Sequence, residues 1–167
     1  MKVRHVSEPV ALRLVPDLRS ALVSITEPGR AAPLPNPDSW GALLRVQFAD
    51  AEYDHAMLAR LEARGVPFDP DAKGFPCRRH AEAIRAFLAG LDVGYVQELI
   101  VHCHAGQRRS AAVAKFASEA LEAQGFDHSY KGYNKTGYAL LKNPATFEPI
   151  TQVRAPNGWL KRLLRRP

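Results

Sequence analysis

The run from Val101 to Ser110 constrains the fold of this chain more than any other stretch of its sequence. It carries Cys103 just after the apolar residues Leu99 to Val101, and five residues then separate Cys103 from the pair Arg109-Ser110. The apolar residues predict a buried strand, and the alanine-rich segment after Ser110 predicts a helix packed on the sheet. Cys103 therefore lies where a strand ends and a helix begins, and loop N–H groups and the helix dipole would surround an anion there.

Each residue type in this loop fits a chemical role in binding and attacking a phosphoryl group. Cys103 is the candidate nucleophile, because a helix N-terminus and a nearby cation can lower a thiol pKa from about 8.5 to roughly 3.5–7.5. Arg109 can bind two oxygens of a phosphoryl group with its planar guanidinium. Ser110 can donate a hydrogen bond to the sulfur, both at rest and when the sulfur is a leaving group. Gly106 allows a backbone angle and a close approach that a Cβ would obstruct.

The remaining loop residues are expected to support or surround the bound phosphate. His102 is expected beneath the loop, where its ring would hydrogen-bond to backbone and hold the cysteine in place. The expected phosphate-binding residues are His104, Ala105, Gly106, Gln107, Arg108 and Arg109. The side chains of His104 and Gln107 would lie at the pocket rim, and Arg108 would add surface charge that attracts acidic substrates.

The sequence His102-Cys103, five residues and Arg109-Ser110 resembles the signature loop (HCX5RS) of the protein tyrosine phosphatase superfamily. In layout, residues 1 to about 145 resemble the small bacterial members of dual-specificity type, including a late helix start at Asn134. The resemblance implies a two-step reaction without a cofactor. Cysteine attack forms a phosphocysteine while an aspartic acid protonates the departing oxygen, and water then hydrolyses the intermediate.

The general acid is predicted to be Asp50, which follows the apolar segment 43–48 and so lies at the sheet edge on which the phosphate loop opens. Asp50 lies further before Cys103 than the acid of the resembling proteins, which implies an insertion at roughly residues 55–74. Alternative acids are Asp54, Asp69 and Asp71. The structural alternative for Asp50 is an N-cap of a helix over residues 51–64.

The other cysteine, Cys77, forms a Cys-x-x-His pair with His80. A metal site is not expected here or at His102 and His104, because ligands in the phosphate loop would consume the nucleophile. Cys77 could form a protective disulfide with Cys103 under oxidation, although a free buried thiol is the favoured interpretation.

Composition favours a soluble, cytoplasmic, single-domain enzyme of 167 residues with no membrane span. Hydrophobic residues make up 46% and charged residues 24%, which is ordinary for a globular protein. Two cysteines are too few for a disulfide framework, and the N-terminus lacks the apolar stretch of a signal peptide. The net charge of +6 suits phosphorylated substrates and leaves nucleic acid open as a partner class.

The order of elements predicts an α/β fold of three layers, phosphatase-like, with a mainly parallel central sheet of four or five strands and helices on both faces. The expected strands are residues 2–6, 21–26, 43–48 and 98–103, and the expected helices include 9–15 and 75–91. The segment 27–38 contains four prolines and predicts a surface loop. The basic segment at about 155–167 is interpreted as a terminal helix docked on the domain, against a tail or a membrane or nucleic-acid contact.

The leading hypothesis is a cysteine-dependent phosphomonoester hydrolase, most consistent with a protein tyrosine phosphatase or a dual-specificity enzyme. Its partner would be a phosphorylated protein or peptide, and phosphate or sulfate would bind in the loop. The enzymatic alternative is a rhodanese-like sulfurtransferase, whose active loop is shorter than the five residues between Cys103 and Arg109. A non-catalytic phosphate-binding module is the third possibility, and it gains only if no aspartic acid reaches the pocket.

Overall fold

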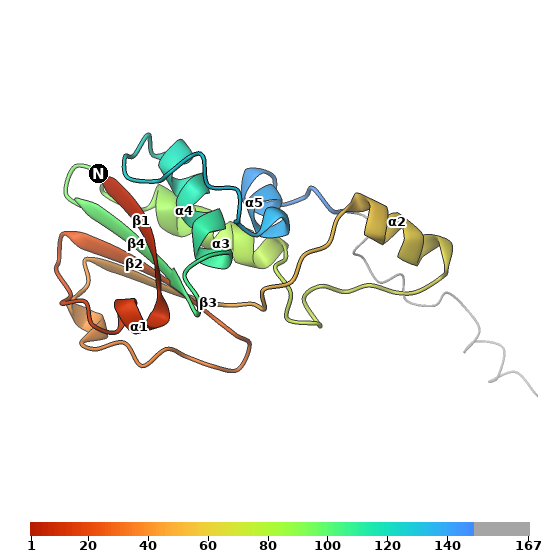
Figure 1. The fold of residues 1–167 in the computed structure, drawn as a ribbon, viewed down its shortest axis with the longest axis horizontal. Coiled ribbons are helices and arrows are strands. Elements are labelled where there is room, and N and C mark those ends of the chain that lie inside the picture. Colours follow the sequence, from red (N-terminus) through yellow and green to blue (C-terminus); the bar gives the residue numbers. More distant parts are fainter. Residues whose placement is uncertain (149–167) are drawn as a thin grey trace, which may run out of the picture.

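A computed structural model describes residues 1–148 and shows an α/β fold around one four-stranded parallel sheet (Figure 1). The strands lie in the spatial order β1-β4-β2-β3. Their bounds are Lys2–Ser7 for β1, Ser20–Thr26 for β2, Ala42–Gln47 for β3 and Glu98–Cys103 for β4. All neighbouring pairs are parallel, so the carboxyl ends of the four strands meet at one edge of the sheet.

The predicted strands are confirmed to within one residue at each end. The two central strands, β4 and β2, are buried almost throughout, which explains why they are continuous apolar runs rather than alternating ones. The outer strand β3 alternates more strongly, since Val46 is buried while Arg45 and Gln47 are exposed.

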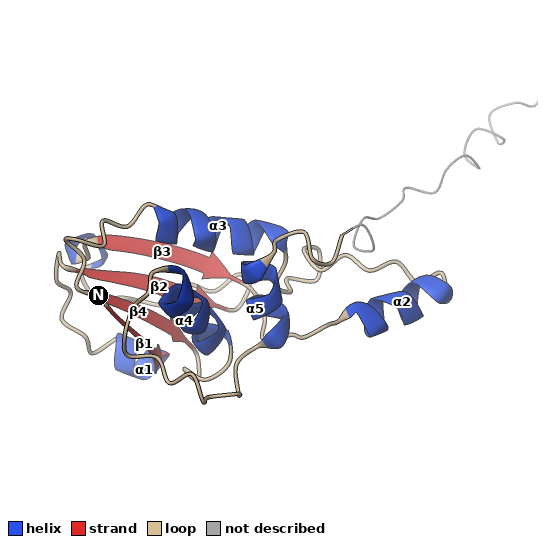
Figure 2. Cartoon of the chain, turned by 90° about the horizontal axis from the view of Figure 1, so that it is seen from above, coloured by secondary structure: helices blue, strands red, loops and turns tan. Residues whose placement is uncertain are grey.

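Helices α3 (Arg78–Ala89) and α4 (Arg109–Ala120) pack on one face of the sheet, and α5 (Lys135–Lys142) packs against both of them (Figure 2). α3 is amphipathic: Ile84 and Leu88 are buried while Arg79 and Glu82 face solvent. The predicted helix at 75–91 is thus confirmed with shorter ends. Residues of α4 are buried on almost every side because the sheet and α5 enclose them.

The other face of the sheet is covered by α1 (Glu8–Ala11) and by the proline-rich segment that precedes β3. Leu34 and Trp40 pack there against Leu22 and Ile100 of the central strands. The expected helix at 9–15 is therefore shorter than predicted, and segment 27–38 is a loop that ends in a 3-10 turn, Pro37–Ser39.

Helix α2 (His55–Ala63) lies away from the sheet, as both ribbon views show (Figures 1 and 2). It belongs to the stretch predicted as an insertion. The helix expected at 51–64 begins later than predicted, because Asp54 and not Asp50 is its N-cap: the Asp54 carboxylate accepts the N–H of Met57 at 2.7 Å.

Among residues 1–148, no helix combines the length and the apolar character needed to cross a bilayer. The predicted docked helix at about 155–167 lies outside the described residues.

Candidate active site

The carboxyl edge of the sheet brings together residues that are far apart in the chain. β4 ends at Cys103, β2 is followed by Glu27, and β3 is followed by Phe48 and Asp50. α4 begins at Arg109, six residues after Cys103. The predicted arrangement of strand, loop and helix is therefore present.

The carbonyl groups of the loop after Cys103 point outward to donors elsewhere in the protein. Their partners are Glu8 N–H for His104 (3.2 Å), the His5 ring for Gly106 (2.7 Å), the Tyr130 hydroxyl for Gln107 (3.1 Å) and Asn134 N–H for Arg108 (3.0 Å). Within residues 1–148, the backbone N–H groups of 104–109 have no hydrogen-bond acceptor. With the carbonyls engaged outside and the amides free, the loop has the polarity of an anion-binding nest.

Gly106 is required by both its conformation and its surroundings. Its φ is +71°, in the left-handed region that disfavours residues with a Cβ. A Cβ at this position would lie 2.3 Å from the backbone nitrogen of Ser7 and 2.4 Å from the carbonyl carbon of Val6. The loop is therefore pressed against the end of β1, and Gly106 has both the backbone angle and the close approach expected of it.

The Cys103 sulfur lies 3.2 Å from the Ser110 hydroxyl oxygen, as expected for a serine that donates to a thiolate. Cys103 is 3% exposed, so its sulfur is at the base of the loop rather than on the surface. Ser110 is fully buried on the first turn of α4.

Arg109 is buried, and two of its nitrogens are held by neighbours from other elements. Nη1 donates to the carbonyl oxygen of Phe48 at 2.7 Å, and Nη2 pairs with Glu27 Oε1 at 2.6 Å. Arg109 Nε is a buried donor without a partner among the described residues. The guanidinium is thus fixed at the sheet edge with unsatisfied donor capacity, while the Glu27 side chain is 47% exposed and accessible to water.

His102 lies beneath the loop, where its fully buried ring accepts or donates a hydrogen bond at 2.8 Å with the Ser24 hydroxyl. Burial lowers the pKa of His102 to about 4, so the imidazole is neutral at neutral pH. His102 therefore lies beneath the loop, as expected, but its hydrogen-bond partner is the Ser24 side chain on β2 rather than a backbone group.

Asp50 lies next to the loop and is held by two partners. Asn134 Nδ2 donates to Asp50 Oδ1 at 2.8 Å, and the Arg108 guanidinium approaches Asp50 Oδ2 at 3.2 Å. Asn134 also donates to the Ala51 carbonyl at 3.0 Å, while its own oxygen caps α5 by accepting Gly137 N–H at 2.7 Å. The fully buried Asn134 therefore connects the Asp50 segment to α5.

The alternative acids are engaged in local structure. Asp54 caps α2, and Asp69 accepts the N–H groups of Asp71 and Ala72 in a turn. Asp71 pairs with Arg79 at 2.7 Å. Of these four aspartates, Asp50 is the one that contacts a loop residue, Arg108, within residues 1–148.

Among the expected phosphate-binding residues, His104, Ala105, Gln107 and Arg108 are exposed, whereas Gly106 is buried. The exposed Arg108 side chain forms ion pairs with two carboxylates. Its guanidinium pairs with Asp50 and, at 2.9 Å, with Glu52. These carboxylates raise the pKa of Arg108 further above its ordinary value, so its charge is permanent.

Cys77 is the N-cap of α3, and both cysteines are free thiols. Burial raises the pKa of Cys77. The protective disulfide with Cys103, which the sequence left open, is thus absent between these two described residues.

Sequence reasoning missed two contacts of this site. Glu27 forms an ion pair with Arg109. The sequence feature that could have indicated this contact is the position of Glu27 directly after β2, at the sheet edge where β4 ends in Cys103. Asn134 was singled out as a helix start, but its contact with Asp50 joins residues 84 positions apart and has no local sequence signature.

Comparisons of this chain with protein-family models, with curated proteins and with solved structures return no match.

Proposed function

We propose that this protein is a cysteine-dependent phosphomonoester hydrolase of the protein tyrosine phosphatase type, with a three-layer phosphatase-like fold. The observation that carries the proposal is the loop after Cys103: four of its carbonyls are bound from outside, and its N–H groups have no acceptor among residues 1–148. Such a loop suits a dianion of phosphate size.

In the first step the Cys103 thiolate attacks phosphorus, and the bond between phosphorus and the leaving oxygen breaks. Asp50 donates its proton to that oxygen, so the leaving group departs as a neutral alcohol or phenol. The products are a phosphocysteine and the Asp50 carboxylate. Free N–H groups of residues 104–109 would bind the phosphoryl oxygens during this transfer.

In the second step a water molecule attacks the phosphocysteine, and Asp50 takes one of its protons. The phosphorus–sulfur bond breaks and the thiolate of Cys103 is restored. The Ser110 hydroxyl, 3.2 Å from the sulfur, would donate to it as negative charge returns.

Arg109 would bind two phosphoryl oxygens with its guanidinium, which is the geometry that arginine favours with phosphate. Its Nε has unsatisfied donor capacity, and Glu27 would be displaced into water when phosphate takes its place. The Phe48 carbonyl would keep the guanidinium in position throughout.

The substrate class that suits this site is a phosphorylated protein or peptide, with phosphotyrosine first and phosphoserine or phosphothreonine as the dual-specificity alternative. The net charge of +6 would attract such anionic substrates.

Hydrolysis of p-nitrophenyl phosphate by the full chain and by single variants tests the proposal. We expect Cys103→Ser and Arg109→Ala to abolish turnover. We expect Asp50→Asn to flatten the alkaline limb of the pH dependence of kcat/KM, because the general acid must be protonated to donate. The other candidate acids are tested by the matched variants Asp54→Asn, Asp69→Asn and Asp71→Asn. Undiminished turnover in Cys103→Ser would refute the mechanism, and an effect confined to Asp71→Asn would reassign the acid.

Assays of the wild-type protein with other ligands separate the two alternative functions. A rhodanese-like enzyme would transfer sulfur from thiosulfate to cyanide and leave p-nitrophenyl phosphate intact. A binding module would bind phosphate in the wild type without turnover of either substrate. Either result replaces the proposed function.

A further inference from the structure

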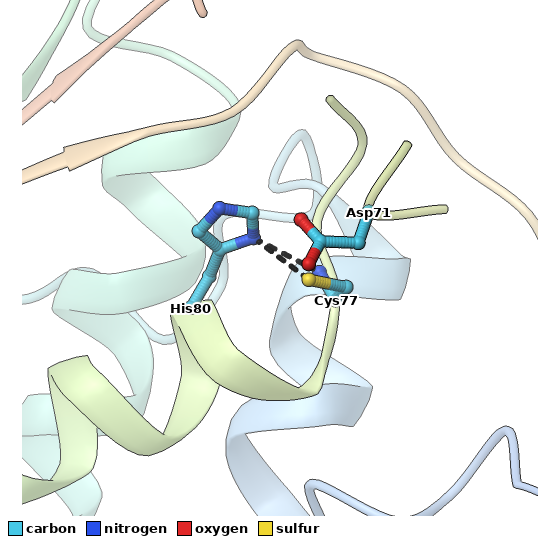
Figure 3. A group of neighbouring side chains, drawn as sticks. All are labelled: Asp71, Cys77 and His80. Carbon is cyan, nitrogen blue, oxygen red and sulfur yellow. Dashed lines mark hydrogen bonds between the residues drawn. The ribbon is translucent and has the colours of Figure 1, made fainter. Parts of the chain in front are cut away.

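A cluster of three side chains outside the phosphate loop combines a carboxylate, a thiol and an imidazole. Asp71 lies in the segment before α3, Cys77 is the N-cap of α3, and His80 is on its first turn (Figure 3). One ligand atom from each lies within 4.8 Å of the other two. From the sequence alone, Cys77 and His80 offered two ligands, and it is the fold that adds Asp71.

We propose that Asp71, Cys77 and His80 form a binding site for a divalent transition-metal ion, with Zn²⁺ as the ion that this ligand set favours. Sulfur, nitrogen and oxygen ligands are the donors that Zn²⁺ takes in proteins, and three protein ligands leave a fourth tetrahedral position for water. The proposal is independent of the phosphatase function.

The spacing of the ligand atoms suits a tetrahedral ion. The Cys77 sulfur lies 3.2 Å from His80 Nδ1. In a tetrahedral zinc site the sulfur and nitrogen ligands are separated by about 3.6 Å, given bonds of about 2.3 and 2.0–2.1 Å. Movement of a few tenths of an ångström would therefore place both atoms at bonding distance from one ion.

His80 has the protonation state that a metal ligand needs. Burial lowers the pKa of His80 to about 4, which keeps the ring neutral at neutral pH. His80 Nδ1 accepts the backbone N–H of Cys77 at 3.2 Å, so the ring proton is on Nε2 and the Nδ1 lone pair faces the cluster. A bound ion would take this lone pair in place of the N–H.

Cys77 would bind as a thiolate and release its proton when the ion enters. Burial raises the pKa of this thiol and the nearby Asp71 carboxylate adds to that effect, while the backbone N–H groups of His80 and Arg79 at the start of α3 lower the pKa by donating toward the sulfur. The ion itself supplies the larger stabilisation of the thiolate.

Access and ligand capacity are also present at Asp71. Arg79 contacts Asp71 through Oδ1, which leaves Oδ2 for an ion, and both side chains are about half exposed or more. A cavity of about 300 Å³ is lined by Asp71 and Cys77 and offers room for the water ligand. The ion would fix the segment that carries Asp71 to the start of α3.

This site lies close to the proposed active site. The His80 ring packs against Phe48 with centroids 5.2 Å apart, and the Phe48 carbonyl binds Arg109. An ion on His80 would therefore restrain the residue that positions this arginine.

Cobalt(II) titration of the full chain tests the site, because Co²⁺ occupies tetrahedral zinc sites and gives a thiolate charge-transfer band. Cys103→Ser is the background, since it leaves Cys77 as the sole thiol of the chain. We expect one equivalent of Co²⁺ to produce the band, and Zn²⁺ to displace it. Zn²⁺ should also raise the melting temperature of this variant.

The matched variants retain the N-cap of α3. Adding Cys77→Ser leaves a good capping residue, and His80→Gln places glutamine at the third helical position, as in a capping box. We expect Cys77→Ser to remove the band. Loss of a residue that only hydrogen-bonds to a metal ligand typically weakens metal binding by roughly 10- to 100-fold. We expect His80→Gln and Asp71→Asn, which remove a ligand itself, to weaken Co²⁺ binding by at least this factor. No band in Cys103→Ser, a band that survives Cys77→Ser, or a band that needs a large excess of Co²⁺ would overturn the proposal.

Discussion

The close contact between Gly106 and the end of β1 predicts a large effect for Gly106→Ala. A left-handed backbone costs an alanine about 1–2 kcal/mol. The new Cβ would also lie 2.3 Å from Ser7 N and 2.7 Å from Val6 O, which are backbone atoms of a strand and cannot turn aside. Overpacking of this kind typically costs about 1–3 kcal/mol. The free energy of unfolding should therefore fall by about 2–5 kcal/mol.

Gly65→Ala is the matched control, because Gly65 has a similar φ of +64° and a Cβ there would meet no atom within 4 Å. Urea denaturation of both variants isolates the contact with β1 as the difference in unfolding free energy. Gly106→Ala should also lose phosphate binding, measured by calorimetry, since the loop must shift to admit the methyl group. Equal stability losses in the two variants, with phosphate binding intact in Gly106→Ala, would refute the described packing of the loop.

Three further predictions follow from the hydrogen bonds and burial of the site. Ser110→Ala removes a hydrogen-bond donor to a charged sulfur, which is worth about 1.5–3 kcal/mol. Hydrolysis of the phosphocysteine should therefore slow by roughly 10- to 150-fold, and the phosphocysteine should accumulate in a rapid-quench assay. A phosphocysteine that decays at the wild-type rate would contradict the role of Ser110. Asn134→Ser keeps an N-cap but loses the donor to Asp50, so it should flatten the alkaline limb of the pH dependence of kcat/KM and add little to the effect of Asp50→Asn. Additive effects of the two substitutions on kcat/KM would show that the two residues act independently. His80 and His102 have pKa values of about 4 in the folded protein and bind protons more readily when the chain is unfolded. The free energy of unfolding should therefore decrease as pH falls from about 6.5 to 4, by on the order of 3 kcal/mol for each histidine. An unfolding free energy from urea titrations that stays constant across this pH range would contradict the burial of the two rings.

The centre of the sheet could be predicted from the sequence because β2 and β4 are buried apolar runs bounded by turn residues. Leu99 to Val101 is apolar at every position since β4 is covered on both faces, and this property is local. Helix starts were less predictable. Both Asp50 and Asp54 are good capping residues, and the choice between them depends on the contact of Asp50 with Asn134, which lies on a distant helix.

The residues of the loop after Cys103 could be predicted from the sequence, but the hydrogen-bond donors that hold the loop in place could not. The order of Cys103, Gly106, Arg109 and Ser110 is visible in the sequence. The donors that turn its carbonyls outward come from three distant segments, around His5, Tyr130 and Asn134. Their pairing depends on tertiary packing, which single residues do not reveal. The cluster of Asp71, Cys77 and His80 is similar, because Asp71 reaches the other two residues through a turn that Asp69 holds.

Trapping of the covalent intermediate shows whether Cys103 is the nucleophile. The full chain would be mixed with p-nitrophenyl phosphate, quenched within milliseconds in denaturant at alkaline pH, digested and examined by mass spectrometry. We expect one added phosphoryl group on the peptide that contains Cys103, and more of it in Ser110→Ala. Turnover of the substrate without a phosphorylated Cys103 peptide, or with the phosphoryl group on another residue, would contradict nucleophilic attack by Cys103.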